Sequence, residues 1–113
     1  MSDEYIIAVT LCNNESIASK ICSVVLSKHL AASCQIYKAN SFYWWEGELE
    51  KSTEYRLEFR SKKSLYSRIE EEIKKVHDYD VAEIMYYTVQ GGSKEFLAWV
   101  DEEVSTNTNE KVG

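Results

Sequence analysis

The stretch EYRLEFR, residues 54–60, alternates strictly between charged and apolar side chains. Its apolar members are Tyr55, Leu57 and Phe59. A period of two is typical of a β-strand with one buried face, and it predicts a strand over 48–61. The aromatic stretch 33–46 precedes it without a helical period, and Gly47 separates the two. We therefore predict a β-hairpin, which limits the chain to folds built on an antiparallel sheet.

Five further segments surround this hairpin. Apolar residues spaced near 3.6 predict helices over 16–30, over 65–77 and over 93–104. Short apolar runs predict strands over 5–12 and 83–90. The order is then β-α-β-β-α-β with a final helix. It predicts an α+β, ferredoxin-like antiparallel sheet with its helices on one face.

Local signals refine these segments. Asn13 and Asn14 suit a turn and a helix N-cap. Gly91 and Gly92 lack a Cβ, and we expect them to allow positive φ. The i,i+4 ion pairs expected on the second helix are Glu70 with Lys74 and Glu71 with Lys75.

The chain length of 113 residues suits one domain, which we place at 1–104, with a flexible tail over 105–113. The net charge of -6 and the lack of a basic cluster argue against nucleic acid as a partner. The chain lacks an apolar run of about 18 residues, and its acidic start is unlike a secretory signal, so we expect no membrane span and a cytoplasmic location. Three scattered cysteines without a CxxC pair suggest reduced thiols.

Large apolar side chains occupy both faces of two predicted strands, over 42–45 and 84–87. One layer of helices covers only one face of a sheet. Leaving the other face in water would expose an aromatic patch larger than monomers usually tolerate, so we expect a homo-oligomer. The charged face of strand 48–61 would also lie toward such an interface, which requires its Glu and Arg groups to pair there.

Four potential metal ligands, His77, Asp78, Asp80 and Glu83, lie within seven residues. Imidazole and carboxylate groups are ligands that borderline divalent ions accept. The spacing is a weak signal, because a structural zinc site needs four convergent ligands. A helix C-cap or a hydrogen-bonded cleft residue remains the other interpretation of His77.

Two motifs resemble the CutA family of divalent-cation tolerance proteins. They consist of Ser41, Tyr43, Trp45, Gly47 and Glu54 in the hairpin, followed by His77, Tyr79, Glu83 and Ile84. The resemblance spans about residues 5–104. It implies a ferredoxin-like subunit assembled as a homotrimer, similar to the trimers of the PII signalling proteins. The chain departs from the family pattern at Asp78 and Ala82, which occupy proline positions, and it contains no proline at all.

The resemblance also implies site residues. His77, Glu83 and Cys12 are the implied metal ligands, since relatives linked to copper binding carry a cysteine at the place of Cys12. From the residue alone, a lone cysteine on an apolar strand such as Cys12 is more often a small core side chain than a ligand. The implied cleft between subunits contains Tyr43, Trp45, Glu54 and Tyr79. No obligatory cofactor is expected, although copper or another divalent cation is a candidate ligand.

Three functions follow. We favour a trimeric binding module of the CutA type, associated with divalent metal and especially copper tolerance, that is not an enzyme. The alternative is a PII-like regulator that binds a small anionic ligand or a partner protein between subunits. An enzyme of the acylphosphatase kind would need a phosphate cradle in its first loop, and CNNES offers neither glycine nor a cation.

Overall fold

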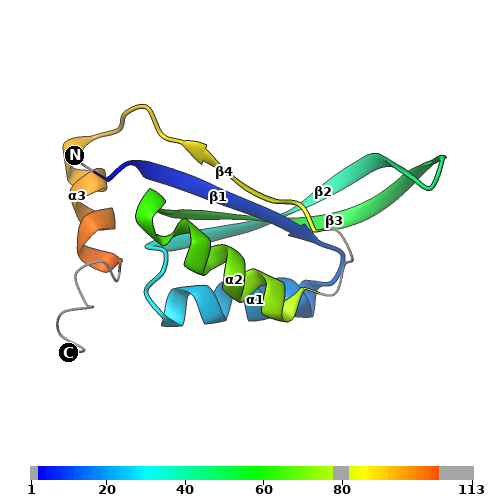
Figure 1. Cartoon of the computed structure of the whole chain (residues 1–113), viewed down its shortest axis with the longest axis horizontal. Helices are drawn as coiled ribbons and strands as arrows, with labels where there is room; N and C mark the ends of the chain where they lie inside the picture. The colour runs from blue at the N-terminus through cyan, green and yellow to red at the C-terminus, as the bar shows by residue number, and fades with distance from the viewer. Residues whose placement is uncertain (1–2, 78–81, 105–113) are drawn as a thin grey trace.

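One four-stranded antiparallel sheet runs through the computed structural model, which describes residues 3–77 and 82–104 (Figure 1). The strand order is β2-β3-β1-β4. In chain order the elements are β1 (Tyr5–Cys12), α1 (Glu15–Ser27), β2 (Ser33–Trp45), β3 (Glu48–Lys62), the 3-10 helix η1 (Lys63–Leu65), α2 (Tyr66–Val76), β4 (Ile84–Thr88) and α3 (Lys94–Glu103). This arrangement confirms the predicted ferredoxin-like fold. The tail predicted over 105–113 lies outside the described residues.

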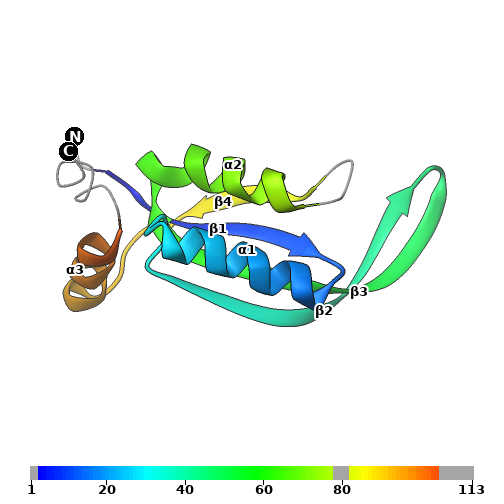
Figure 2. The same cartoon turned by 90° about the horizontal axis from the view of Figure 1, so that it is seen from below.

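Helices α1 and α2 lie side by side and cover one face of the sheet (Figure 2). The register places Ala8 of β1 between Phe59 of β3 and Tyr86 of β4, all on this covered face. The largest fully buried side chains of the core include Phe59, Leu57, Ile21, Ile69 and Ile73. The alternation that predicted β3 therefore has its apolar half against the helices.

An ion pair also joins the two helices. The Lys28 ammonium lies 2.8 Å from a carboxylate oxygen of Glu72, whose residue is only 8% exposed. The same oxygen lies 3.3 Å from the ammonium of Lys75. Lys75 therefore pairs three residues back and not, as predicted, with Glu71. The predicted pair of Glu70 with Lys74 is confirmed at 2.9 Å.

Helix α1 begins as predicted but ends earlier. The Asn14 side-chain oxygen accepts a hydrogen bond from the Ile17 backbone N–H at 3.1 Å, which makes Asn14 the N-cap. The helix stops at Ser27, because Lys28 leaves the helical region and His29 takes a left-handed φ of 56°. The predicted end at residue 30 is therefore wrong by three residues.

Positive φ angles occur at the hairpin turn. Glu46 has a φ of 49° and Gly47 a φ of 82°, and Trp45 pairs directly with Glu48 across this two-residue turn. Two positive φ values in succession define a type I′ turn, whose twist matches that of the flanking strands. Gly91 and Gly92 allow positive φ but do not adopt it, and Gly47 is the glycine with that geometry among the described residues. The segment after β4 therefore bends without left-handed residues.

Helix α3 lies at the end of the sheet and not on its face (Figure 1). Its Asp101 accepts hydrogen bonds from the Tyr5 hydroxyl at 2.7 Å and from the Lys62 ammonium at 2.6 Å. Val100 and Val104 are buried. Phe96 of the same helix is 43% exposed, because the helix contacts the domain along a narrow side only.

Candidate functional site

The sheet face opposite the helices carries a network of paired charges. On β3, the Glu58 carboxylate lies 3.2 Å from Arg56 Nε and 3.8 Å from Arg60 Nη1. From the edge strand β2, the Tyr37 hydroxyl donates a hydrogen bond of 2.6 Å to the same carboxylate. The Glu and Arg groups of this face thus pair within one chain. An interface on this side was expected to require such pairing.

The network changes the acidity of its members. The hydrogen bond from Tyr37 is the largest cause that lowers the pKa of Glu58, and the neighbouring arginines add to it. The same bond raises the pKa of Tyr37. Burial lowers the pKa of Arg56, but its hydrogen bonds to Tyr87, Glu58 and Tyr37 outweigh this and raise it. The charged forms of Glu58 and Arg56 are therefore stabilised on the sheet face opposite the helices.

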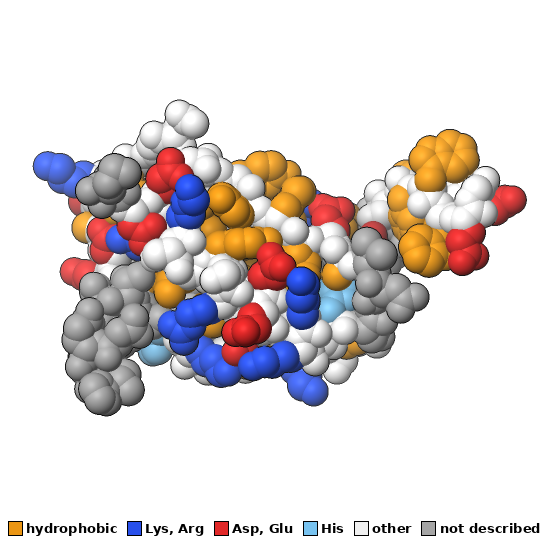
Figure 3. Space-filling model, in the orientation of Figure 1, with side chains coloured by type: hydrophobic (Ala, Val, Ile, Leu, Met, Phe, Trp, Pro, Cys, Tyr) orange, Lys and Arg blue, Asp and Glu red, His pale blue; other side chains and the backbone are white. Residues whose placement is uncertain are grey.

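The β2–β3 hairpin extends well beyond the rest of the sheet. Strand β1 pairs with β3 only from Tyr55 to Lys62, so residues 39–54 of the hairpin pair only with each other (Figures 1 and 2). We call this segment the arm. Its most exposed apolar side chains are Trp44 at 74%, Phe42 at 62% and Leu49 at 61%. Figure 3 shows hydrophobic side chains gathered on the projecting arm, away from the body of the molecule.

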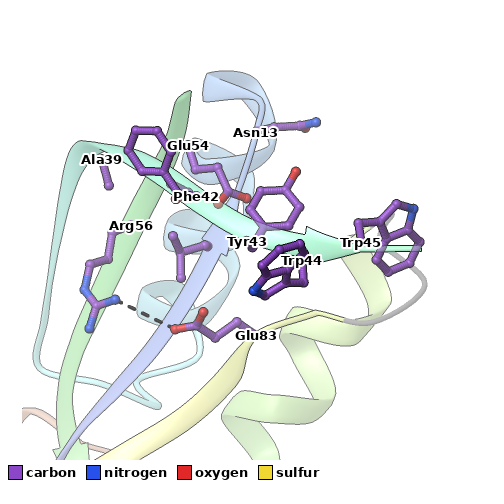
Figure 4. A pocket seen from close by; sticks show the side chains of 11 residues that line it. Asn13, Ala39, Phe42, Tyr43, Trp44, Trp45, Glu54, Arg56 and Glu83 are labelled. Atoms are coloured by element: carbon purple, nitrogen blue, oxygen red, sulfur yellow. Dashed lines mark ion pairs between the residues drawn. The ribbon is translucent and has the colours of Figure 1, made fainter. Parts of the chain in front are cut away.

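A cleft of about 700 Å³ lies where the arm leaves the sheet. It is lined by Leu11, Asn13, Ala39, Ser41, Phe42, Tyr43, Trp44, Trp45, Glu54, Arg56 and Glu83 (Figure 4). Arg56 and Glu83 face each other across it, with Nη1 and Oε2 3.8 Å apart. Glu54 is only 8% exposed although it carries a carboxylate. The cleft therefore combines aromatic walls with two carboxylates and one guanidinium.

The structure brings several predicted site residues together. Tyr43, Trp45 and Glu54, predicted for a cleft, all line this one, and so does Glu83, predicted as a metal ligand. Tyr79 lies outside the described residues. Tyr43 and Trp45 come from β2, Glu54 comes from β3, and Glu83 directly precedes β4. Strand β1 lies between β3 and β4 and joins these elements.

His77 and Cys12 lie close to the cleft without lining it. His77 caps α2 through its backbone N–H, which bonds to the Ile73 carbonyl at 2.8 Å. Its ring Nε2 lies 2.5 Å from the carbonyl oxygen of Leu11, a residue of the cleft wall. Cys12, the next residue, is fully buried in the core, with Sγ 3.5 Å from the Asn14 carbonyl.

The predicted metal ligands do not form a complete site within one chain. In residues 3–77 and 82–104, no three His, Cys, Asp or Glu side chains gather closely enough to hold a metal ion. Asp78 and Asp80 lie outside those ranges. The imidazole and carboxylate groups near the cleft therefore supply fewer donors than a closed site requires.

Sequence reasoning missed Arg56 and Asn13 as cleft residues. Arg56 was assigned to a plain charged face, and Asn13 to a turn. The role of Arg56 depends on its position opposite Leu11 and near Tyr87 and Glu83, which are set by strand pairing across the sheet. Local sequence carries no signal for such pairing.

The family model of the CutA1 divalent ion tolerance protein matches residues 6–103. A divalent-cation tolerance protein CutA from Archaeoglobus fulgidus is 36% identical over 100 residues, which cover 88% of this chain and 94% of that protein. A CutA homolog from Danio rerio is 35% identical over 95 residues, covering 83% of this chain and 63% of the relative. The solved A. fulgidus structure superposes with a TM-score of 0.85 at 30% identity, over 88% of this chain and 97% of that one.

The comparisons also correct the predicted location. The solved A. fulgidus protein is described as a periplasmic divalent cation tolerance protein, so the expectation of a cytoplasmic location is wrong on this finding. The composition of a folded domain does not record the compartment in which it works. Within the described ranges, the helices are too short or too polar to cross a membrane. With a family model matched along nearly the whole domain and relatives above 30% identity, the chain belongs to the CutA1 family of divalent ion tolerance proteins.

Proposed function

We propose that this chain assembles as a homotrimer and acts in divalent-cation tolerance by binding metal, copper in particular, without catalysing a reaction. The observation that carries the proposal is the exposure of large apolar side chains on the arm. Its apolar side chains stand clear of the core, with Trp44 and Phe42 mostly exposed. Apolar surface of this extent is stable in water when another protein surface covers it. The number three comes from the resemblance to the CutA family.

Assembly would also close the cleft. The arm forms one wall and the sheet the other, and both are open in a single chain. A second copy seated against the arm would cover the aromatic wall and bring its own donors toward Glu83 and His77. This supports a metal site shared between chains, because one chain alone offers too few ligands.

The charge of the cleft favours a cation over an anion. Glu54 and Glu83 contribute two carboxylates against the single guanidinium of Arg56. That guanidinium is already engaged by Glu58, Glu83 and Tyr87. An anionic ligand, as a PII-like regulator would bind, has no unengaged cation to meet among the residues that line the cleft.

Cys12 is a weaker ligand candidate than His77 or Glu83. Its side chain is fully buried among core residues, whereas Glu83 lies at the cleft surface. A metal would reach Cys12 only if β1 and its neighbours moved. We therefore assign the first metal contacts to Glu83 and His77.

Copper and zinc titration of the reduced protein tests this assignment. We expect Glu83→Gln and His77→Ala each to weaken binding by roughly tenfold or more, and Cys12→Ser to leave it unchanged. His29→Ala is the matched control, because His29 is the other histidine, is exposed, does not line the cleft, and contacts the Glu103 carbonyl oxygen of α3. Equal affinities in wild type, Glu83→Gln and His77→Ala would refute the site.

Two further measurements separate the alternatives. A thermal-shift series with nucleotides and small organic acids should show no stabilisation that grows with concentration. Hydrolysis of an acyl phosphate should not exceed background. Dose-dependent stabilisation by an anion would favour the regulator, and hydrolysis above background would favour an enzyme.

A further inference from the structure

Two cysteine side chains lie between α1 and the beginning of β2. Cys22 follows Ile21 and lies one helical turn after Ala18, and both of these α1 residues are fully buried. Cys34 pairs with Phe59, which places its side chain on the covered face of the sheet. Both cysteines pack against the core, and the Cys22 side chain lies within interaction range of the Cys34 thiol.

This pair differs from Cys12 in its surroundings. Cys12 has no exposed surface, whereas Cys22 and Cys34 are both only partly buried. Cys22 and Cys34 both carry free thiols in the structure. A pair of neighbouring thiols with partial access to solvent has the two properties that thiol–disulfide exchange requires.

We propose that Cys22 and Cys34 form a redox-sensitive dithiol that closes to an intramolecular disulfide by exchange with a small-molecule disulfide such as oxidised glutathione. The bridge would join the middle of α1 to the beginning of β2. Because β2 continues directly into the arm, the covalent link would fix the base of the strand that carries the exposed aromatic side chains.

The exchange proceeds in two balanced steps. The Cys22 thiol loses its proton and attacks one sulfur of the small disulfide, which releases one small thiolate and leaves a mixed disulfide on Cys22. The Cys34 thiol then loses its proton and attacks the Cys22 sulfur, which releases the second small thiolate. The two cysteines lose two electrons in total, and the small disulfide gains them as two thiols.

The surroundings of Cys34 set this order. Burial, followed by the neighbouring Cys22, raises the pKa of the Cys34 thiol well above its ordinary value. Its Sγ also lies 3.8 Å from the carbonyl oxygen of Gln35, a further partner for the protonated thiol. A thiol held protonated is a poor first nucleophile toward a dissolved disulfide. In the second step its position beside the Cys22 sulfur compensates, because the attack is intramolecular.

The experiment measures which thiols are oxidised. The reduced, full-length protein is incubated with oxidised glutathione at increasing ratios to reduced glutathione, quenched with an alkylating reagent in denaturant, and weighed by intact mass spectrometry. We expect the oxidised wild-type protein to carry two fewer alkyl groups than the reduced protein and to have lost two hydrogen atoms. A digest of it should contain a peptide in which Cys22 is linked to Cys34. Cys12→Ser should behave like wild type.

Two controls keep the inference falsifiable. Cys22→Ser and Cys34→Ser should each abolish the linked peptide, while circular dichroism confirms that both remain folded. The folded wild-type protein should form the bridge at a ratio of oxidised to reduced glutathione that is at least about tenfold lower than the ratio needed by the urea-unfolded chain. The reason is that the fold holds the two thiols close together. Equal ratios for folded and unfolded protein, a bridge that includes Cys12, or cross-links only between chains would overturn the proposal.

Discussion

Replacing Trp44 by alanine tests the role of the arm most directly. Trp44 is 74% exposed in the single chain. A tryptophan side chain offers up to about 250 Å² for burial, so about 185 Å² remain for a partner to cover. At about 25 cal/mol per Å² this area corresponds to about 4–5 kcal/mol as an upper bound. If about half is realised after the costs of association, the loss is about 2 kcal/mol per contact, or about 30-fold in dissociation constant.

The same substitution should have little effect on the stability of the folded subunit. The Trp44 side chain lies outside the core, so its truncation should cost less than about 0.5 kcal/mol of unfolding free energy in the dissociated chain. Sedimentation velocity or light scattering over a concentration series measures the assembly, and circular dichroism checks the fold. Glu50→Ala is the matched control, because it truncates an exposed residue of the same arm without removing aromatic area.

Two results would refute the reasoning. The first is a wild-type protein that stays a 13.1 kDa particle at micromolar concentration. The second is a folded Trp44→Ala protein that dissociates at the same concentration as wild type and as Glu50→Ala.

Three further predictions concern the fold. Phe59→Ala should lower the free energy of unfolding in urea by about 3–5 kcal/mol, because it empties a fully buried aromatic site; a loss below that of a surface substitution would contradict the assigned core. Gly47→Ala should cost roughly 1–2 kcal/mol in the same assay, since its φ of 82° disfavours a Cβ although the space around it is open. Glu72→Gln should lose about 0.5–1 kcal/mol at neutral pH. The hydrogen bond from Lys28 is the largest cause of the lowered pKa of Glu72, so its stabilisation is complete above the ordinary carboxyl range and disappears as pH falls through the lowered pKa; a difference from wild type that persists in strong acid would contradict this origin.

The sequence predicted those features of the fold that depend on local pattern. The alternation around Leu57 identified β3 and its buried side, and Asn14 marked the start of α1. The end of α1 was missed, because the left-handed turn at His29 occurs at a residue type that rarely signals it. The helix α3 was predicted with the right extent, but its place at the sheet end depends on Asp101 meeting Tyr5 from the far end of the chain.

The candidate site was predictable only in part. Tyr43, Trp45 and Glu54 were named from family motifs, and all three line the cleft. The sequence did not predict that Arg56 lines the cleft, because its position there follows from the register of three paired strands. In the proposed shared site, metal binding by His77 would also need residues of other chains, whose positions do not follow from the pattern of one sequence.

The charge network on the open sheet face has a consequence for how copies recognise each other. Glu58 is already neutralised by Arg56 and Arg60 of its own strand, with Tyr37 completing its hydrogen bonds. A docking copy would therefore meet a nearly balanced surface and would need few ion pairs across the boundary. Ionic strength should then have little influence on subunit affinity, and discrimination against unrelated chains would come from the fit of aromatic shapes.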